Sequence, residues 1–240
     1  MNKESMSNKW PKTPPQLTEK QKEIGDDWLK YWLSLMPGKY GAYAKFNHEY
    51  VIKNAPAEFE STLEIGCGDG EHLNFEKLNE AQEKKYVAID IRQNIVDAFK
   101  RKHSKIQCYV SDCQARQNFE NNSFDRILAI HVLEHLPNLP AAVDELYRLC
   151  NKERGVLSIV LPCEGSLAYT FARKISAERM FKKRYKMPYD WYMKSEHINT
   201  IDEVLEELSR KFIIQKSTFF PLKIKIREVN LAIGYTLTPI

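Results

Sequence analysis

The stretch TLEIGCGDGEHL at residues 62–73 decides the fold. A short apolar run comes first, and Gly66, Gly68 and Gly70 follow at alternate positions. Because glycine has no Cβ, such a loop can turn tightly, and a ligand can approach the backbone N–H groups at a helix start. We therefore expect a strand, a nucleotide-binding type of glycine loop, and a helix over 71–83.

Further apolar runs of strand length follow the glycine loop, and helix-forming stretches separate them. Continuous apolar character is typical of strands buried on both faces, and β–α alternation predicts a doubly wound, mainly parallel sheet with right-handed crossovers. The last two runs are joined by a connection too short for a crossover helix, so we expect an antiparallel last strand in a seven-stranded sheet. The runs after 62–66 are 86–90, 106–110, 124–130, 155–162, 212–220 and 230–238; the helical stretches are 71–83, 94–102, 139–150 and 201–211.

Three segments differ from this alternation. Residues 1–16 are polar and proline-marked, and we expect a flexible arm. Residues 17–60 are expected to form a helical cap, whose helix begins after a capping box at Thr18 and ends at Pro37-Gly38. We expect residues 61–240 to form the main α/β domain, in which 163–200 is an inserted lid, since insertions of that length usually cover or build a site.

The composition fits one globular domain in a reducing compartment. The 240 residues are 43% hydrophobic, no run is long enough to span a membrane, and the first residues lack the apolar centre of a signal peptide. The cysteine count is odd, and no C-x-x-C pair is present, so we expect free thiols and a cytoplasmic protein. The cysteines are Cys67, Cys108, Cys113, Cys150 and Cys163. Nothing in the sequence fixes the oligomeric state.

A basic run over 172–186 contrasts with the small net charge of +4. Leu167, Phe171 and Ile175 are four residues apart, so the run can begin as an amphipathic helix with its cationic face in water. It can also meet the phosphate of a nucleotide- or lipid-linked sugar, or an anionic membrane surface. RNA is a third interpretation, but no known RNA-binding module is present, and we do not expect a nucleic-acid partner.

Acidic residues at the ends of the predicted strands accompany the glycine loop. Glu64 stands two positions before Gly66, and Asp90 ends the second strand 20 residues after Gly70. A carboxylate at that place can accept both ribose hydroxyls of a nucleoside. The spacing G-x-G-x-G differs from the G-x-G-x-x-G of dinucleotide-binding folds, which argues against an oxidoreductase. The pair Asp112-Cys113 follows the third strand, and F-D-x-I-x-x-x-x-x-L-E-H over 124–135 follows the fourth.

This ordered set, over about 61–162, resembles class I S-adenosylmethionine-dependent methyltransferases. The resemblance implies a Rossmann-like fold, S-adenosylmethionine as the cofactor and S-adenosylhomocysteine as its product. It also implies a role for each matching residue. Glu64 would lie near the methionine amino group, Gly66, Cys67 and Gly68 along the methionine part, Asp90 at the ribose, Ile91 on the adenine, Asp112 and Cys113 at the adenine edge, and His131 beside the methionine.

The stretch HVLEH offers a competing chemistry. It has the form H-x-x-E-H of one class of zinc peptidases, so a metal-dependent hydrolase using His131, Glu134 and His135 is an alternative. Pro137 and Pro140 interrupt the helix that this would need. Some related methyltransferases carry E-x-x-E-H here and use it for a divalent metal. His131 replaces their first Glu, and because Mg²⁺ prefers oxygen ligands, we expect no metal.

The acceptor is expected to be small and polar. Tyr189, Tyr192, Glu196 and His197 join aromatic faces to polar groups, which suits a sugar, although such aromatics also pack lids onto sheets. The segment is weakly similar to methyltransferases of bacterial surface-polysaccharide gene clusters. His131, His135 and His197 are the candidate bases for methyl transfer to O or N. A non-catalytic cofactor-binding partner protein is the other alternative.

Overall fold

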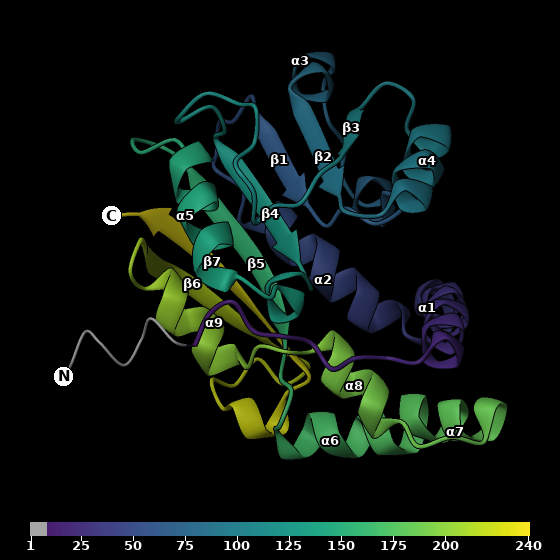
Figure 1. Ribbon diagram of the computed structural model, residues 1–240. Helices are drawn as coiled ribbons and strands as arrows, with labels where there is room; N and C mark the ends of the chain where they lie inside the picture. Colours follow the sequence, from purple (N-terminus) through teal and green to yellow (C-terminus); the bar gives the residue numbers. More distant parts are fainter. Residues whose placement is uncertain (1–8) are drawn as a thin grey trace.

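The computed structural model describes residues 9–240, and β1 (Thr62–Ile65) lies inside its seven-stranded sheet (Figure 1). The strand order is β3-β2-β1-β4-β5-β7-β6. β7 is antiparallel to β5 and β6, whereas the pairs among β1 to β5 are parallel. The predicted doubly wound sheet with an antiparallel last strand is therefore confirmed. The other strands are β2 (Tyr86–Asp90), β3 (Gln107–Val110), β4 (Arg126–Ile130), β5 (Val156–Pro162), β6 (Phe212–Phe220) and β7 (Ala232–Pro239).

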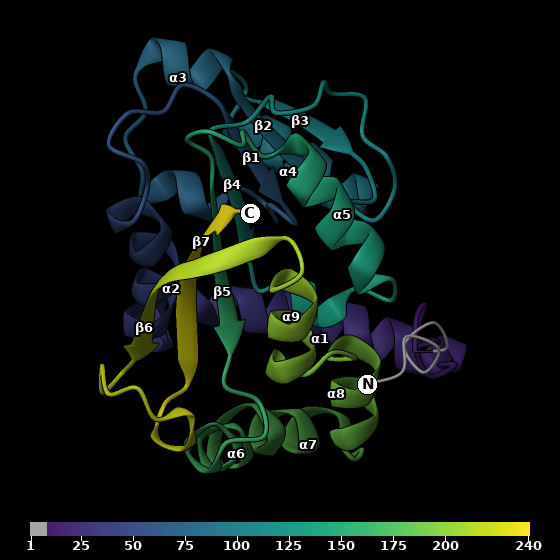
Figure 2. The same ribbon diagram turned by 90° about the vertical axis from the view of Figure 1, so that its left-hand side faces the viewer.

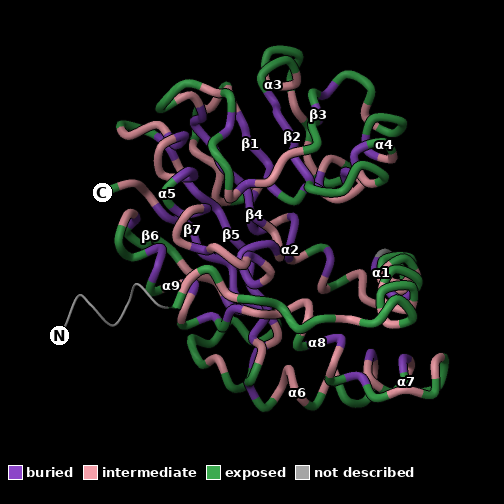
Figure 3. The backbone as a smooth tube through the Cα atoms, viewed as in Figure 1, coloured by how far each residue is buried: buried purple, intermediate pink, exposed green. Residues whose placement is uncertain are grey.

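Helices cover both faces of the sheet (Figures 1 and 2). α5 (Leu139–Leu149) and α9 (Ile201–Leu208) pack on one face, and α2 (Gly41–Lys53) and α4 (Gln93–Lys102) pack on the other. β1, β2, β4 and β5 are buried along almost their whole length (Figure 3). The prediction that the run 106–110 is buried on both faces is wrong, because β3 is an edge strand and half of Tyr109 and Val110 is exposed.

The helix predicted over 71–83 is interrupted. A 3₁₀ turn, η2 (Glu71–Asn74), and a short helix, α3 (Glu80–Lys84), replace it. Glu76 lies between them, and its carboxylate binds the buried guanidinium of Arg126 at 2.5 and 2.6 Å and accepts from His72 at 2.8 Å. A buried arginine needs such a partner, and the chain leaves the helical conformation where Glu76 supplies it.

The amino-terminal helix α1 (Glu19–Lys39) begins at the predicted capping box, where the Thr18 hydroxyl accepts from the Gln21 N–H. The predicted end at Pro37-Gly38 is wrong, because the helix continues to Lys39. A proline so near the end removes only one N–H donor, and the chain turns at Tyr40, where α2 starts. Of the predicted arm, residues 1–8 lie outside the described residues. In the rest, Lys12 bonds the carbonyl of Ile198 and the carboxylate of Glu203.

The predicted lid is helical and packs on α1. It contains α6 (Leu167–Arg173), a π-helix (Lys174–Glu178), α7 (Arg179–Tyr185) and α8 (Asp190–Glu196). The ring of Trp28 in α1 is buried, with centroids 5.3 Å from Phe181 and 6.1 Å from Tyr189. This aromatic cluster is separate from the core of the sheet. The lid and α1 are therefore held together as one layer beyond the carboxyl ends of the strands.

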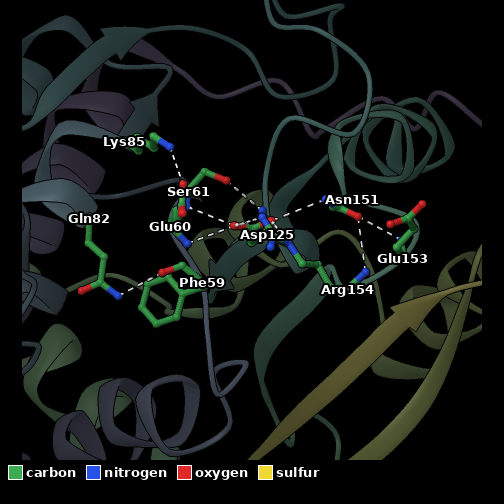
Figure 4. A network of polar contacts seen from close by, with 9 residues as sticks. All are labelled: Phe59, Glu60, Ser61, Gln82, Lys85, Asp125, Asn151, Glu153 and Arg154. Carbon is green, nitrogen blue, oxygen red and sulfur yellow. Dashed lines mark hydrogen bonds and ion pairs between the residues drawn. The ribbon is translucent and has the colours of Figure 1, made fainter.

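Asp125 of the predicted F-D-x-I motif has a structural role at the amino end of β4 (Figure 4). Its carboxylate accepts from the N–H groups of Glu60 and Ser61 at 3.0 and 3.4 Å, and from Nε of Arg154 at 2.8 Å. Burial opposes its charge, but these donors outweigh burial and lower the pKa of Asp125. The starts of β1, β4 and β5 are thereby held together by one carboxylate.

Candidate functional site

The glycine loop lies at the edge where the carboxyl ends of the parallel strands meet. Gly66, Gly68 and Gly70 all have left-handed backbone, with φ of +60°, +56° and +85°. A Cβ on Gly66 would lie 2.5 Å from Val132 Cγ2, whereas a Cβ on Gly68 would meet no atom within 4 Å. Packing against the segment after β4 thus requires glycine at 66, and the backbone at Gly68 faces open space that a ligand can approach.

Asp90 ends β2 beside this loop and is buried. Its carboxylate accepts from the Gly68 N–H at 3.3 Å and from the N–H and Nε of Arg92 at 3.0 and 3.3 Å. A carboxylate has about four acceptor positions, so two hydroxyls can bind once the exposed Arg92 side chain moves. Ile91 is 62% exposed and offers an apolar surface next to the acid.

Asp112 and Cys113 lie at the neighbouring strand end. The Ser111 N–H bonds the Asp90 carbonyl at 3.0 Å, which ties this turn to the end of β2. Asp112 Oδ1 accepts from both the backbone and the side-chain amide of Gln114 at 2.9 Å, while no residue in 9–240 donates to Oδ2. Cys113 is buried. The structure thus brings the glycine loop, Asp90, Ile91 and Asp112 to one edge.

Glu64 lies on β1 inside the sheet and is buried. Its Oε2 accepts from the Tyr86 hydroxyl at 2.8 Å. Burial raises the pKa of Glu64 to about 8, although the Tyr86 hydrogen bond and the charge of Arg126 act in the opposite direction. Near pH 7 the Glu64 carboxyl is therefore mostly protonated, and a nearby ammonium group would favour its ionised form.

The HVLEH stretch does not form an α-helix. His131 directly follows β4 with φ +55°, and a 3₁₀ turn, η3 (Leu133–His135), comes next. The two histidines therefore do not share the helix face that the zinc-peptidase alternative needs. Within residues 9–240, no group of three His, Cys, Asp or Glu side chains is placed to hold a metal ion.

Glu134 is the buried centre of a cluster of histidines. Its Oε1 accepts from His131 Nδ1 at 3.3 Å and lies 3.9 Å from His135 Nε2. Burial alone would raise the pKa of Glu134, but the hydrogen bond from His131 and the charges of His135, His131 and His197 lower it to about 2. Glu134 is therefore ionised at neutral pH.

The three histidines of this cluster have different environments. His131 uses both nitrogens, because Nδ1 faces Glu134 and Nε2 lies 3.4 Å from the hydroxyl of Tyr43 on α2. His197 Nδ1 binds Glu164. Burial opposes the charge on His197, but the hydrogen bond to Glu164 and the charges of Glu134 and Glu196 outweigh it, so the pKa of His197 is raised.

His135 is bonded through one ring nitrogen, to a backbone carbonyl. Its Nδ1–H donates to the Glu196 carbonyl at 2.7 Å, which leaves the lone pair on Nε2. Its ring lies edge-on to that of His197 with centroids 4.9 Å apart. Burial lowers the pKa of His135 and the charge of His197 lowers it further, against the opposite effect of Glu134. The ring is therefore neutral near pH 7.

A small pocket lies beside the cluster, lined in part by Glu134, Glu164 and Asn199. Glu134 Oε2 and Asn199 Oδ1 are buried and have no hydrogen-bond partner within residues 9–240. The Asn199 amide is oriented by two bonds, from Nδ2 to the carbonyls of Leu133 and Leu136 at 2.8 Å. Both free atoms are acceptors, and the pocket volume is about 10 Å³, so it suits one water or one hydroxyl group that donates hydrogen bonds.

Sequence reasoning identified some of this cluster and missed other parts. Tyr189 and Tyr192, predicted to contact substrate, are buried and stack on each other with centroids 5.6 Å apart within the lid cluster. Glu164 was missed, although it stands two residues after β5, at the same edge as Asp90 and His131. Tyr43 was missed as a partner of His131, because nothing in sequence spacing relates α2 to the end of β4.

Comparisons with known proteins concern the fold that carries these residues. Residues 63–159 match a family model described as a methyltransferase domain. An uncharacterized protein of Methanocaldococcus jannaschii is 33% identical over 154 residues, which cover 61% of this chain and 64% of that protein. The chain thus spans less than two thirds of this curated relative.

Solved structures share the fold at low sequence identity. A TehB-like S-adenosylmethionine-dependent methyltransferase from Corynebacterium glutamicum has a TM-score of 0.58 at 15% identity, over 90% of this chain and 98% of its own. The N-methyltransferase NodS from Bradyrhizobium japonicum, solved with S-adenosyl-L-homocysteine, has a TM-score of 0.53 at 13% identity, over 81% and 86%. Residues 63–159 are therefore similar to a methyltransferase domain, and the chain shares the fold of these solved structures.

Proposed function

We propose that this protein is an S-adenosylmethionine-dependent methyltransferase that acts on O or N of a small polar acceptor. One observation carries the proposal. The open backbone at Gly68, the buried carboxylate of Asp90 and the exposed face of Ile91 lie together at neighbouring strand ends. A sulfonium cofactor would supply an electrophilic methyl group there. The family model and a neighbour solved with the product support the same chemistry.

The residues at this edge fit the parts of the cofactor. Asp90 would accept the ribose hydroxyls in place of the Arg92 side chain, and Ile91 would cover the adenine. Asp112 Oδ2 would accept the adenine amine, and Cys113 would donate its backbone N–H. The methionine part would lie along Gly66, Cys67 and Gly68, with its ammonium group near Glu64 and its side chain bordered by His131.

We assign the general base to His135. Its Nε2 carries the lone pair, its pKa is lowered, and the ionised Glu134 at 3.9 Å would stabilise the imidazolium that forms on proton uptake. His131 is engaged at both nitrogens, whereas His197 is bonded to Glu164 through Nδ1 and has a raised pKa, which favours its protonated form. Both therefore act as positioning residues in this proposal.

A sugar or sugar-linked metabolite is the acceptor class that we propose. Glu134 Oε2 and Asn199 Oδ1 need donors, and hydroxyl groups supply them. Glu164 and Glu196 add carboxylate oxygens beside His197 and His135. Tyr189 and Tyr192 hold the lid in place from behind, since their rings are buried among Trp28 and Phe181.

Replacing Asp90 with alanine is expected to weaken S-adenosylhomocysteine binding by about 100-fold or more, because two hydrogen bonds to a charged acceptor are lost. Isothermal titration calorimetry measures this. Asp97→Ala is the control, because Asp97 is an exposed carboxylate on α4 that bonds only Gln93 among the described residues. Equal affinity of Asp90→Ala and wild type would show that the ribose does not bind here.

The proposed interaction of His135 with His197 can be tested without a methyl acceptor. His197→Gln removes a positive charge beside His135, so the pKa of His135 should rise in this variant. NMR titration of the histidine ring protons measures it, with His135→Gln to assign the signal. Lys194→Gln, which removes an exposed charge from α8, should leave that pKa unchanged. An unchanged or lower pKa in His197→Gln would contradict the proposed pairing.

Methyl transfer itself is tested with labelled S-adenosylmethionine and a panel of sugars and nucleotide-linked sugars. We expect label in at least one acceptor, and a loss of about 100-fold in kcat for His135→Gln, the usual scale for a general base. Lys194→Gln again serves as the control. Tight cofactor binding without any labelled acceptor would favour the non-catalytic alternative. Full activity of His135→Gln would exclude His135 as the base.

A further inference from the structure

Six exposed apolar side chains form a patch on the lid and on the connection between β6 and β7 that contacts it. Each of the six is 51% to 76% exposed, and they belong to two segments that contact each other. α6 contacts η5 (Arg227–Val229) of the connection between β6 and β7, and Figures 1 and 2 show the two segments side by side. The apolar patch consists of Leu167, Phe171 and Ile175 from α6 and the π-helix, and Leu222, Ile224 and Ile226 from the connection.

The connection that carries half of the patch has a fixed shape. Asn230 is buried, and its side chain accepts from the Leu222 N–H at 3.0 Å and donates to the carbonyls of Ile224 and Ile226 at 2.9 and 2.8 Å. The Leu167 N–H donates to Glu228 at 3.0 Å, which joins α6 to the same connection. The apolar side chains are therefore presented outward by an ordered backbone.

The patch is also cationic. Lys223 and Lys225 alternate with its apolar residues, and Lys174 precedes Ile175. All three lysines are exposed, and within residues 9–240 none of them forms an ion pair. One interpretation of the sequence was an amphipathic helix with its cationic face in water, but the structure leaves the apolar face of α6 in water as well.

These charges distinguish between the surfaces that could cover the patch. A two-fold contact between copies would place the same lysines against one another, and like charges in an interface are destabilising. The phosphates of a nucleic acid would pair with the lysines, but a nucleic acid would not bury the aliphatic side chains. A bilayer surface does both, because apolar side chains enter the headgroup boundary while lysines meet anionic lipids. Within the described residues, no helix is long and apolar enough to cross a membrane.

We propose that the apolar patch docks this protein on the surface of an anionic lipid bilayer. Phe171 and Ile224 enter the boundary between headgroups and acyl chains, and Lys174, Lys223 and Lys225 contact the lipid phosphates. Glu164 of the histidine cluster stands three residues before Leu167, so docking also places the candidate site close to the membrane. The proposal stands on the patch alone and does not depend on methyl transfer.

The test is co-sedimentation of the full chain with vesicles of phosphatidylcholine, alone or mixed with phosphatidylglycerol. We expect at least tenfold stronger binding to the mixed vesicles, and at least tenfold weaker binding of Phe171→Ser/Ile224→Ser to them. Lys223→Gln/Lys225→Gln should reduce binding and its salt dependence. The matched control is Ile213→Ser/Ile214→Ser on β6, which removes two exposed apolar side chains elsewhere and should bind as wild type does.

Other outcomes overturn the proposal. The first is that wild type does not bind mixed vesicles. The second is that Phe171→Ser/Ile224→Ser unfolds at the same temperature as wild type and binds mixed vesicles equally strongly. If sedimentation equilibrium shows that wild type is a dimer and the same double variant is a monomer, the patch binds a second copy of this chain. Binding of a single-stranded RNA oligonucleotide in place of vesicles would assign the lysines to nucleic acid.

Discussion

The parallel register of β1, β2, β4 and β5 is the constraint on which the candidate site depends. Because each crossover returns the chain to the same end of the sheet, every carboxyl end opens at one edge. Gly66, Asp90 and His131 are far apart in sequence but end neighbouring strands there. At the opposite edge, Asp125 holds the strand starts together and so fixes the register that aligns them.

The second half of the site depends on a short set of backbone bonds between β4 and the lid. The Glu134 carbonyl accepts from the N–H groups of Ile198 and Asn199 at 3.0 Å, and the Asn199 amide bonds two further carbonyls of the same turn. These bonds bring His197 next to His135. The aromatic contacts of Trp28 with Phe181 and Tyr189 hold the lid from its other side. The candidate site is therefore made of strand ends and a lid that is held by the turn after β4 at residues 198–199 and by α1 at Phe181 and Tyr189.

The parts predicted well from sequence are those that repeat along the chain. The spacing of the apolar runs predicted the sheet. The polar residues after the runs predicted that Asp90 and Asp112 lie at strand ends. The interruption of the helix predicted over 71–83 could not be foreseen, because it depends on the buried Arg126, 50 residues away from Glu76. Glu164 and Tyr43 join the histidines only through tertiary contacts. The exposure of Leu167 and Phe171 could not be inferred either, since periodicity shows an apolar face but not what covers it.

A crystal structure with S-adenosylhomocysteine tests the central claim most directly. The account predicts both ribose hydroxyls within hydrogen-bond distance of Asp90, the Arg92 side chain displaced, the adenine on Ile91, and the sulfur on the side of the glycine loop that faces His131. Binding of the product away from Gly68 and Asp90, or an Asp90 carboxylate that keeps its bonds to Arg92 and does not touch the ligand, would contradict it.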